Sequence, residues 1–130
     1  MKKIIFLGNG FAYPDSYGIE IYKHLADKCT SDDIELIEGG IGGLNLALHF
    51  DCIDDIILVD HGSGYNKKLF NINEIDLTKI KEYNHDTAFL YLLKTIEKSN
   101  INIYFSNNNN WKSSDIIQDS KEILNLVGVV

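Results

Sequence analysis

The stretch Asp54-Asp55-Ile56-Ile57-Leu58-Val59-Asp60-His61-Gly62 decides the fold that the sequence predicts. Its centre holds four consecutive apolar residues, three of them β-branched. Such a run is typical of a strand buried on both faces, as in a parallel sheet covered by helices. The run ends at the carboxylate of Asp60. Ligands bind beyond the carboxyl ends of the strands in open α/β sheets, so we expect a functional site at this end.

Similar signals along the rest of the chain predict alternating strands and helices. The predicted strands are short apolar or alternating runs, at 4–7, 34–37, 56–59, 68–72 and 101–105. The predicted helices carry apolar residues at helical spacing, at 17–29, 44–52, 84–96 and from a cap at 113 or 114 to 124. We therefore expect a single α/β domain over residues 1–130, with three α/β/α layers and a mostly parallel sheet of about five strands.

Composition and charge argue against several classes of partner. The chain of 130 residues has a formal net charge of -7 and a pI of about 4.9. No cluster of Lys and Arg is visible, so we expect no nucleic-acid partner. The apolar runs are too short to span a bilayer, and Met1-Lys2-Lys3 leads directly into a predicted strand. We expect a cytoplasmic protein with no membrane partner.

The glycine-rich turns do not predict an organic cofactor. Gly8-Asn9-Gly10 follows the first predicted strand but lacks the third glycine of a dinucleotide fingerprint. A phosphate-binding G-x-x-x-x-G-K-[ST] loop does not occur. Four glycines within 39–43 instead allow the backbone to approach a neighbouring strand or a ligand closely.

Three side chains that can bind a metal occur at equivalent places in the predicted fold. Asp15 lies in the loop after the first strand, Asp60 at the tip of the central strand, and His85 at the first turn of a helix. Two carboxylates and an imidazole suit zinc or nickel. The structural alternative is that Asp15 caps a helix, Asp60 accepts hydrogen bonds from loop amides and His85 lies at the surface. Spacing alone leaves both interpretations open.

The remaining histidines and one polar loop give weaker signals. We interpret His24 and His49 as residues on helix faces, because their neighbours are apolar at helical spacing. His61 follows Asp60 and is expected to point away from it if the strand extends that far. Residues 107–111 predict a substrate-facing loop with an exposed Trp111, or a disordered tip.

Four ordered blocks of this sequence resemble the motifs of one known family. These are Phe6-Leu7-Gly8-Asn9 with Pro14-Asp15-Ser16-Tyr17-Gly18, then Glu38-Gly39-Gly40-Ile41-Gly42-Gly43, Leu58-Val59-Asp60-His61 and His85-Asp86. The family's corresponding motifs are G-x-G-N with D-[DE]-x-x-G, D-G-G-T-x-G, V-D-A and a histidine that opens a helix. The chain thereby resembles the nickel-iron hydrogenase maturation endopeptidases, over roughly two-thirds of its length.

The resemblance implies an activity, a metal and a partner. Enzymes of this family remove a C-terminal extension from the hydrogenase large-subunit precursor after nickel has been loaded. The implied metal-contacting residues are Asp15, Asp60 and His85, with Asp15 and Asp60 also catalytic. The nickel would be supplied by the substrate. The glycine block implies substrate contacts at Gly39, Gly40, Gly42 and Gly43.

Two other functions remain open beside this endopeptidase. One is a non-proteolytic, chaperone-like homologue that binds a nickel protein with the same fold. The other is a flavodoxin-like ligand domain without a metal.

Overall fold

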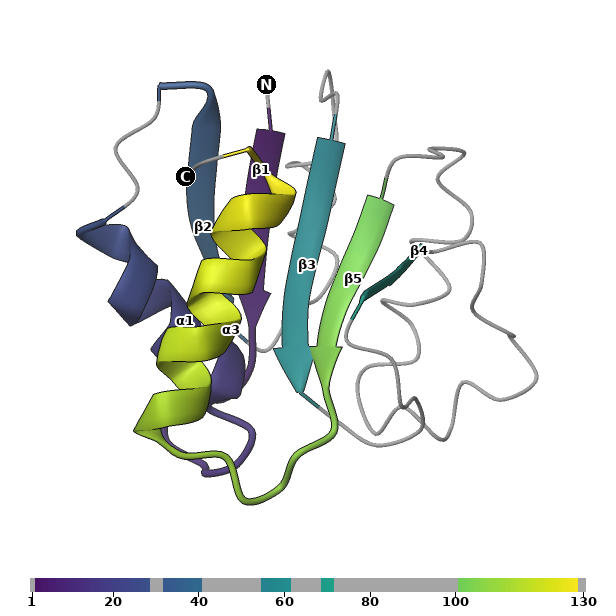
Figure 1. Cartoon of the computed structure of the whole chain (residues 1–130). Helices are drawn as coiled ribbons and strands as arrows, with labels where there is room; N and C mark the ends of the chain where they lie inside the picture. Colours follow the sequence, from purple (N-terminus) through teal and green to yellow (C-terminus); the bar gives the residue numbers. More distant parts are fainter. Residues whose placement is uncertain (1, 29–31, 41–54, 62–68, 72–100, 129–130) are drawn as a thin grey trace.

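The computed structural model describes residues 2–28, 32–40, 55–61, 69–71 and 101–128 (Figure 1). Its strands are β1 (Lys2–Leu7), β2 (Ile34–Gly40), β3 (Asp55–His61), β4 (Leu69–Asn71) and β5 (Ile101–Ser106). Its helices are α1 (Tyr17–Ala26) and α3 (Ser113–Leu126). The helices predicted over 44–52 and 84–96 lie outside the described residues. Neither described helix is long and apolar enough to cross a membrane.

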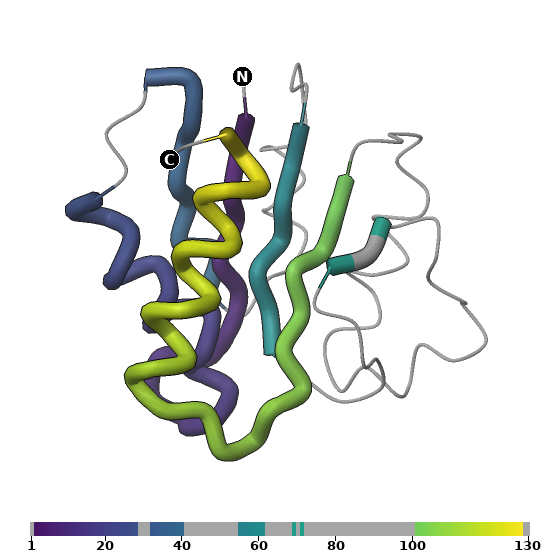
Figure 2. The backbone as a smooth tube through the Cα atoms, in the orientation of Figure 1, coloured from purple at the N-terminus to yellow at the C-terminus, as the bar shows by residue number. Residues whose placement is uncertain are grey.

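The strands form one sheet in the order β2-β1-β3-β5-β4. Neighbouring strands among β2, β1, β3 and β5 pair in parallel, and β4 pairs antiparallel to β5 at the sheet's edge. The predicted α/β fold, its mostly parallel sheet of about five strands and its edge strand are thus confirmed. Because β1 and β3 are parallel neighbours, their carboxyl ends lie side by side, as Figures 1 and 2 show.

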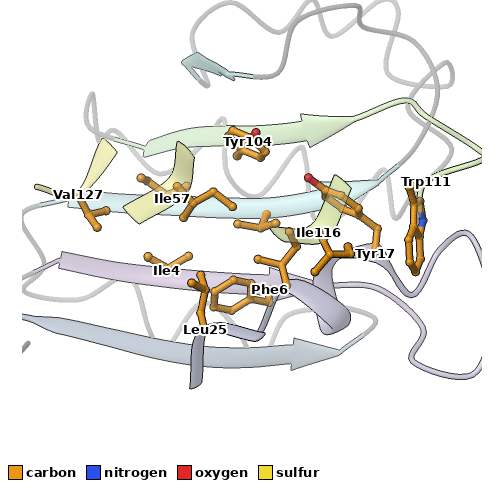
Figure 3. Packing of buried hydrophobic residues seen from close by; sticks show 12 residues of the cluster. Ile4, Phe6, Tyr17, Leu25, Ile57, Tyr104, Trp111, Ile116 and Val127 are labelled. Atoms are coloured by element: carbon orange, nitrogen blue, oxygen red, sulfur yellow. The ribbon is translucent and has the colours of Figure 1, made fainter. Parts of the chain in front are cut away.

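The hydrophobic core lies between the sheet and the two described helices, which cover the same face of it (Figure 1). Alternate residues of β1 and β3 point into this core, where Phe6 and Ile57 pack in one cluster with Leu25 and Ile116 of the helices (Figure 3). Side chains of the opposite sheet face, such as Leu58, are buried too. The sequence pattern for strands buried on both faces is therefore confirmed.

Four strands extend further than the apolar runs predict, and β2 and β3 do so by the most residues. β3 continues through His61, and β2 continues to Gly40 although the glycine block was expected to end it. Pairing with β1 explains the second difference: Phe6 is paired with Glu38, and after a shift in register Leu7 is paired with Gly40. The ladder of hydrogen bonds to a neighbouring strand thus overrides the weak strand preference of glycine.

Helix α3 brings two carboxylates to buried tyrosines. The Tyr17 hydroxyl donates to Asp119 at 2.8 Å, and the Tyr104 hydroxyl donates to Glu122 at 2.6 Å. Burial first, and then the charge of Asp119, raise the pKa of Tyr17 far above its ordinary value. Burial and the hydrogen bond to Glu122 likewise raise the pKa of Tyr104. Both side chains therefore stay protonated in the folded chain at alkaline pH.

We expect these tyrosines to make the fold sensitive to strong alkali. Their pKa values are higher in the folded than in the unfolded chain, so their contribution to stability is full below about pH 10 and is lost as the pH rises further. The free energy of unfolding should then fall by about 1.4 kcal/mol per pH unit for each tyrosine. Denaturant unfolding between pH 9 and about 12 measures this, and Tyr17→Phe should reduce the slope. An unchanged free energy over this range would contradict the expectation.

Candidate functional site

The β1–α1 loop (residues 8–16) folds back over the carboxyl ends of β1 and β3. A Cβ atom on Gly18 would lie 2.1 Å from the carbonyl oxygen of Leu7 and 3.0 Å from that of Val59. Only a glycine lets the start of α1 lie this close to both strand ends. Asp15 lies three residues before Gly18 in the sequence, and Asp60 directly follows Val59. The two predicted acids therefore lie at the same end of the sheet, where the parallel strands have their carboxyl ends.

Asp15 is half-buried, and its carboxylate forms a hydrogen bond within the β1–α1 loop. Its Oδ2 atom accepts a hydrogen bond from the backbone N–H of Asn9 at 2.9 Å. The residue at the N-cap of α1 is Ser16, whose side chain makes no capping hydrogen bond. The structural alternative that Asp15 caps this helix is therefore wrong.

Asp60 and His61 are consecutive buried residues at the end of β3. Asp60 is 8% exposed, and its Oδ1 atom accepts from the backbone N–H of His61 at 2.8 Å. The Nε2 atom of His61 lies 3.0 Å from the carbonyl oxygen of Asn108, so this nitrogen carries the proton and donates. The His61 ring also lies 6.2 Å from that of Tyr17, centroid to centroid. His61 thus faces α1, and by strand alternation Asp60 faces the other side, as predicted.

The third predicted metal-contacting residue, His85, lies outside the described residues. Within the ranges that the structure covers, no three His, Cys, Asp or Glu side chains are grouped so that they could hold a metal. Asp15 and Asp60 supply carboxylate oxygens at neighbouring strand ends, and His85 would have to complete the set. The metal triad therefore stays a prediction.

The glycine block is described only in part. A Cβ atom on Gly39 would lie 2.9 Å from the Ile5 and Leu7 side chains, which shows a close approach to the neighbouring strand. At Gly40, where φ is +59°, no described atom would lie within 4 Å of a Cβ, and its carbonyl oxygen accepts from the N–H of Gly8. Gly42 and Gly43 lie outside the described residues. Substrate contact by the four glycines stays a prediction.

Trp111 corrects the expectation of an exposed residue on a substrate-facing loop. Its side chain is only 9% exposed, and its Nε1–H donates to the carbonyl oxygen of Pro14 at 2.8 Å. The Tyr13 hydroxyl donates in return to the carbonyl oxygen of Trp111 at 2.7 Å, and the two rings lie 4.6 Å apart. Figure 3 shows Trp111 beyond the strand ends, beside Tyr17. Trp111 therefore holds the β1–α1 loop that carries Asp15.

A groove of about 350 Å³ lies beside Trp111 and is lined by residues of both α1 and α3, including His24 and Ile117. Neither predicted acid lines it. His24 lies half-buried on a face of α1, as predicted, and desolvation and the neighbouring Lys28 lower its pKa. The groove is therefore separate from the candidate site at the strand ends.

These observations define an α/β domain with two acids at the carboxyl ends of adjacent parallel strands. Solved structures with the same fold include the hydrogenase maturating endopeptidase HybD from E. coli, with a TM-score of 0.75 at 13% identity over 98% of this chain and 93% of that one. The hydrogenase maturation protease HybD from Thermococcus kodakarensis gives 0.65 at 19% identity over 97% of both chains. A hydrogenase 2 maturation peptidase from a thaumarchaeon gives 0.68 at 11% identity over 99% of both.

The chain thus has the fold of the hydrogenase maturation proteases, as its sequence motifs imply. By sequence, no protein-family profile and no curated protein matches it. The likeness in structure extends over nearly the whole of each compared chain.

Proposed function

We propose that this chain is an endopeptidase that removes the C-terminal extension of a nickel-loaded hydrogenase large-subunit precursor. The observation that carries the proposal is the placing of Asp15 and Asp60 at adjoining strand ends, held there by the close approach of Gly18 to β1 and β3. Support comes from the fold, which is shared over nearly the full length with proteins named as hydrogenase maturation endopeptidases.

Peptide hydrolysis at this site needs a polarised carbonyl group and a water that loses a proton. The nickel belongs to the substrate, and Asp15, Asp60 and His85 would complete its ligand set. If both proteins supplied ligands to one nickel ion, the scissile peptide would be fixed beside the two acids and its carbonyl group would be polarised. In the competing version, one carboxylate acts as the general base that takes a proton from water.

Both versions need carboxylates that are oriented in advance. The N–H of Asn9 orients the Asp15 carboxylate and that of His61 orients the Asp60 carboxylate, so both acids are positioned before a substrate arrives. At Gly40, the space around the absent Cβ is open among the described residues, which would let a substrate backbone approach. We include Gly39, Gly42 and Gly43 in this substrate contact from the motif alone.

Cleavage of the precursor is the direct test. The purified chain is incubated separately with a nickel-loaded and with a nickel-free large-subunit precursor. The masses of the products are then measured by mass spectrometry. We expect a loss of mass equal to the C-terminal extension from the nickel-loaded precursor only. Binding without cleavage would favour the chaperone-like alternative, and neither binding nor cleavage would contradict both.

A further inference from the structure

The β1–α1 loop presents the most exposed large apolar side chain among the described residues. The Phe11 side chain is 104% exposed relative to an extended reference, and the Tyr13 side chain is 57% exposed. Hydrophobic side chains of this size gain free energy when they leave water. A partner that covered this phenyl ring at the candidate site would therefore gain binding free energy from it.

Hydrogen bonds fix the backbone of the loop on both sides of Phe11. The backbone N–H of Phe11 donates to Oδ1 of Asn9 at 3.0 Å, and that of Ala12 donates to the carbonyl oxygen of Asn9 at 3.1 Å. Ser16 N–H donates to the Ala12 carbonyl oxygen at 2.9 Å. These hydrogen bonds close two successive turns, and Phe11 is the third residue of the first turn, Asn9 to Ala12.

Trp111 fixes the same loop from the other side. The hydrogen bonds that join its indole to Pro14 and the Tyr13 hydroxyl to its carbonyl group link the loop to the start of α3. A loop backbone that is held in place before binding loses little conformational entropy when a partner covers it. The backbone that carries Phe11 is therefore preorganised, and the exposed ring on it can act as an anchor.

We propose that Phe11, with Tyr13 beside it, docks into an apolar pocket of the hydrogenase large-subunit precursor next to its C-terminal extension. This inference rests on the proposed function and names the surface that recognises the substrate. Phe11 and Asp15 lie in one loop four residues apart, so a peptide bond brought to Asp15 arrives with its parent protein against Phe11. The net charge of -7 disfavours an anionic partner such as a nucleic acid or an acidic membrane.

The test compares the binding of Phe11→Ala and Leu126→Ala to the nickel-loaded precursor. Leu126 is also an exposed apolar residue, 44% exposed, and it lies at the far end of α3 from the loop (Figure 1). Titration calorimetry should show that Phe11→Ala raises the Kd about 10- to 30-fold, whereas Leu126→Ala leaves it unchanged. Phe11→Tyr, which keeps the ring, should bind nearly as well as the parent chain. Circular dichroism checks that all three variants fold.

The outcomes separate this inference from the proposed function. If the parent chain cleaves the precursor and Phe11→Ala raises neither the Kd nor KM, docking through Phe11 is contradicted while the endopeptidase stands. If the parent chain binds through Phe11 but does not cleave, docking stands and the endopeptidase fails. No binding by the parent chain would contradict the docking. The docking would also be contradicted if the parent chain formed dimers in solution and Phe11→Ala dissociated them. A second copy of the chain would then be the partner that covers this loop.

Discussion

Gly18→Ala is expected to lower the free energy of unfolding by about 3 kcal/mol or more, which places it above the usual range for an added methyl group in a packed interior. The new Cβ would lie 2.1 Å from the carbonyl oxygen of Leu7 and 3.0 Å from that of Val59. Both are backbone atoms of central strands and cannot turn aside as a side chain could. The start of α1 would have to move away from β1 and β3.

Gly10→Ala is the matched control for this substitution. Among the described residues, a Cβ on Gly10 would meet only the Cγ2 atom of Ile19, at the ordinary contact distance of 3.5 Å. We expect its free energy of unfolding to change by no more than about 0.5 kcal/mol. Urea denaturation followed by circular dichroism compares the two variants with the parent chain. Equal midpoints for Gly18→Ala and Gly10→Ala would show that α1 does not press on the strand ends.

Asp60→Asn and Asp15→Asn should each reduce the rate of precursor cleavage about 100- to 10,000-fold while the chain stays folded. An asparagine side chain has nearly the same shape as aspartate, and its carbonyl oxygen can still accept from the N–H of His61 or Asn9. What is lost is the negative charge that would bind nickel or take a proton from water. The initial rate of cleavage, measured by mass spectrometry, is the readout.

The same two variants distinguish a metal-binding carboxylate from a general base. Loss of a nickel ligand should weaken the binding of the nickel-loaded precursor as well as slow its cleavage, whereas loss of a base should slow cleavage alone. Asp27→Asn, at an exposed position after the end of α1, is the control and should cleave at the parent rate. Parent-like rates in both Asp60→Asn and Asp15→Asn would remove these residues from the proposed mechanism.

The sequence predicted the sheet well because its signals are local. The apolar run at 56–59 needs no partner to indicate a buried strand, and the alternating run at 68–72 indicated the edge strand that is now β4. The ends of the strands were less predictable. Whether β2 stops at the glycine block depends on its pairing with β1, and the local sequence of β2 does not indicate that pairing.

The candidate site was predictable to a different extent. The motifs identified Asp15 and Asp60, and the parallel pairing of β1 with β3 brings their strand ends together. The burial of Trp111 could not be predicted, because its partners, Tyr13 and Pro14, lie 98 and 97 residues away in the sequence. A polar run of asparagines before it suggested exposure, and no local pattern indicated that the indole would be covered.

The position of Trp111 gives the protein a built-in optical reporter. It is the sole tryptophan of the chain, and its indole is hydrogen-bonded to Pro14, the residue before Asp15. Any shift of that loop alters the polarity around the indole and hence its fluorescence emission. Metal ions and short peptides that lack tryptophan could therefore be followed at the candidate site in real time, without attaching a dye.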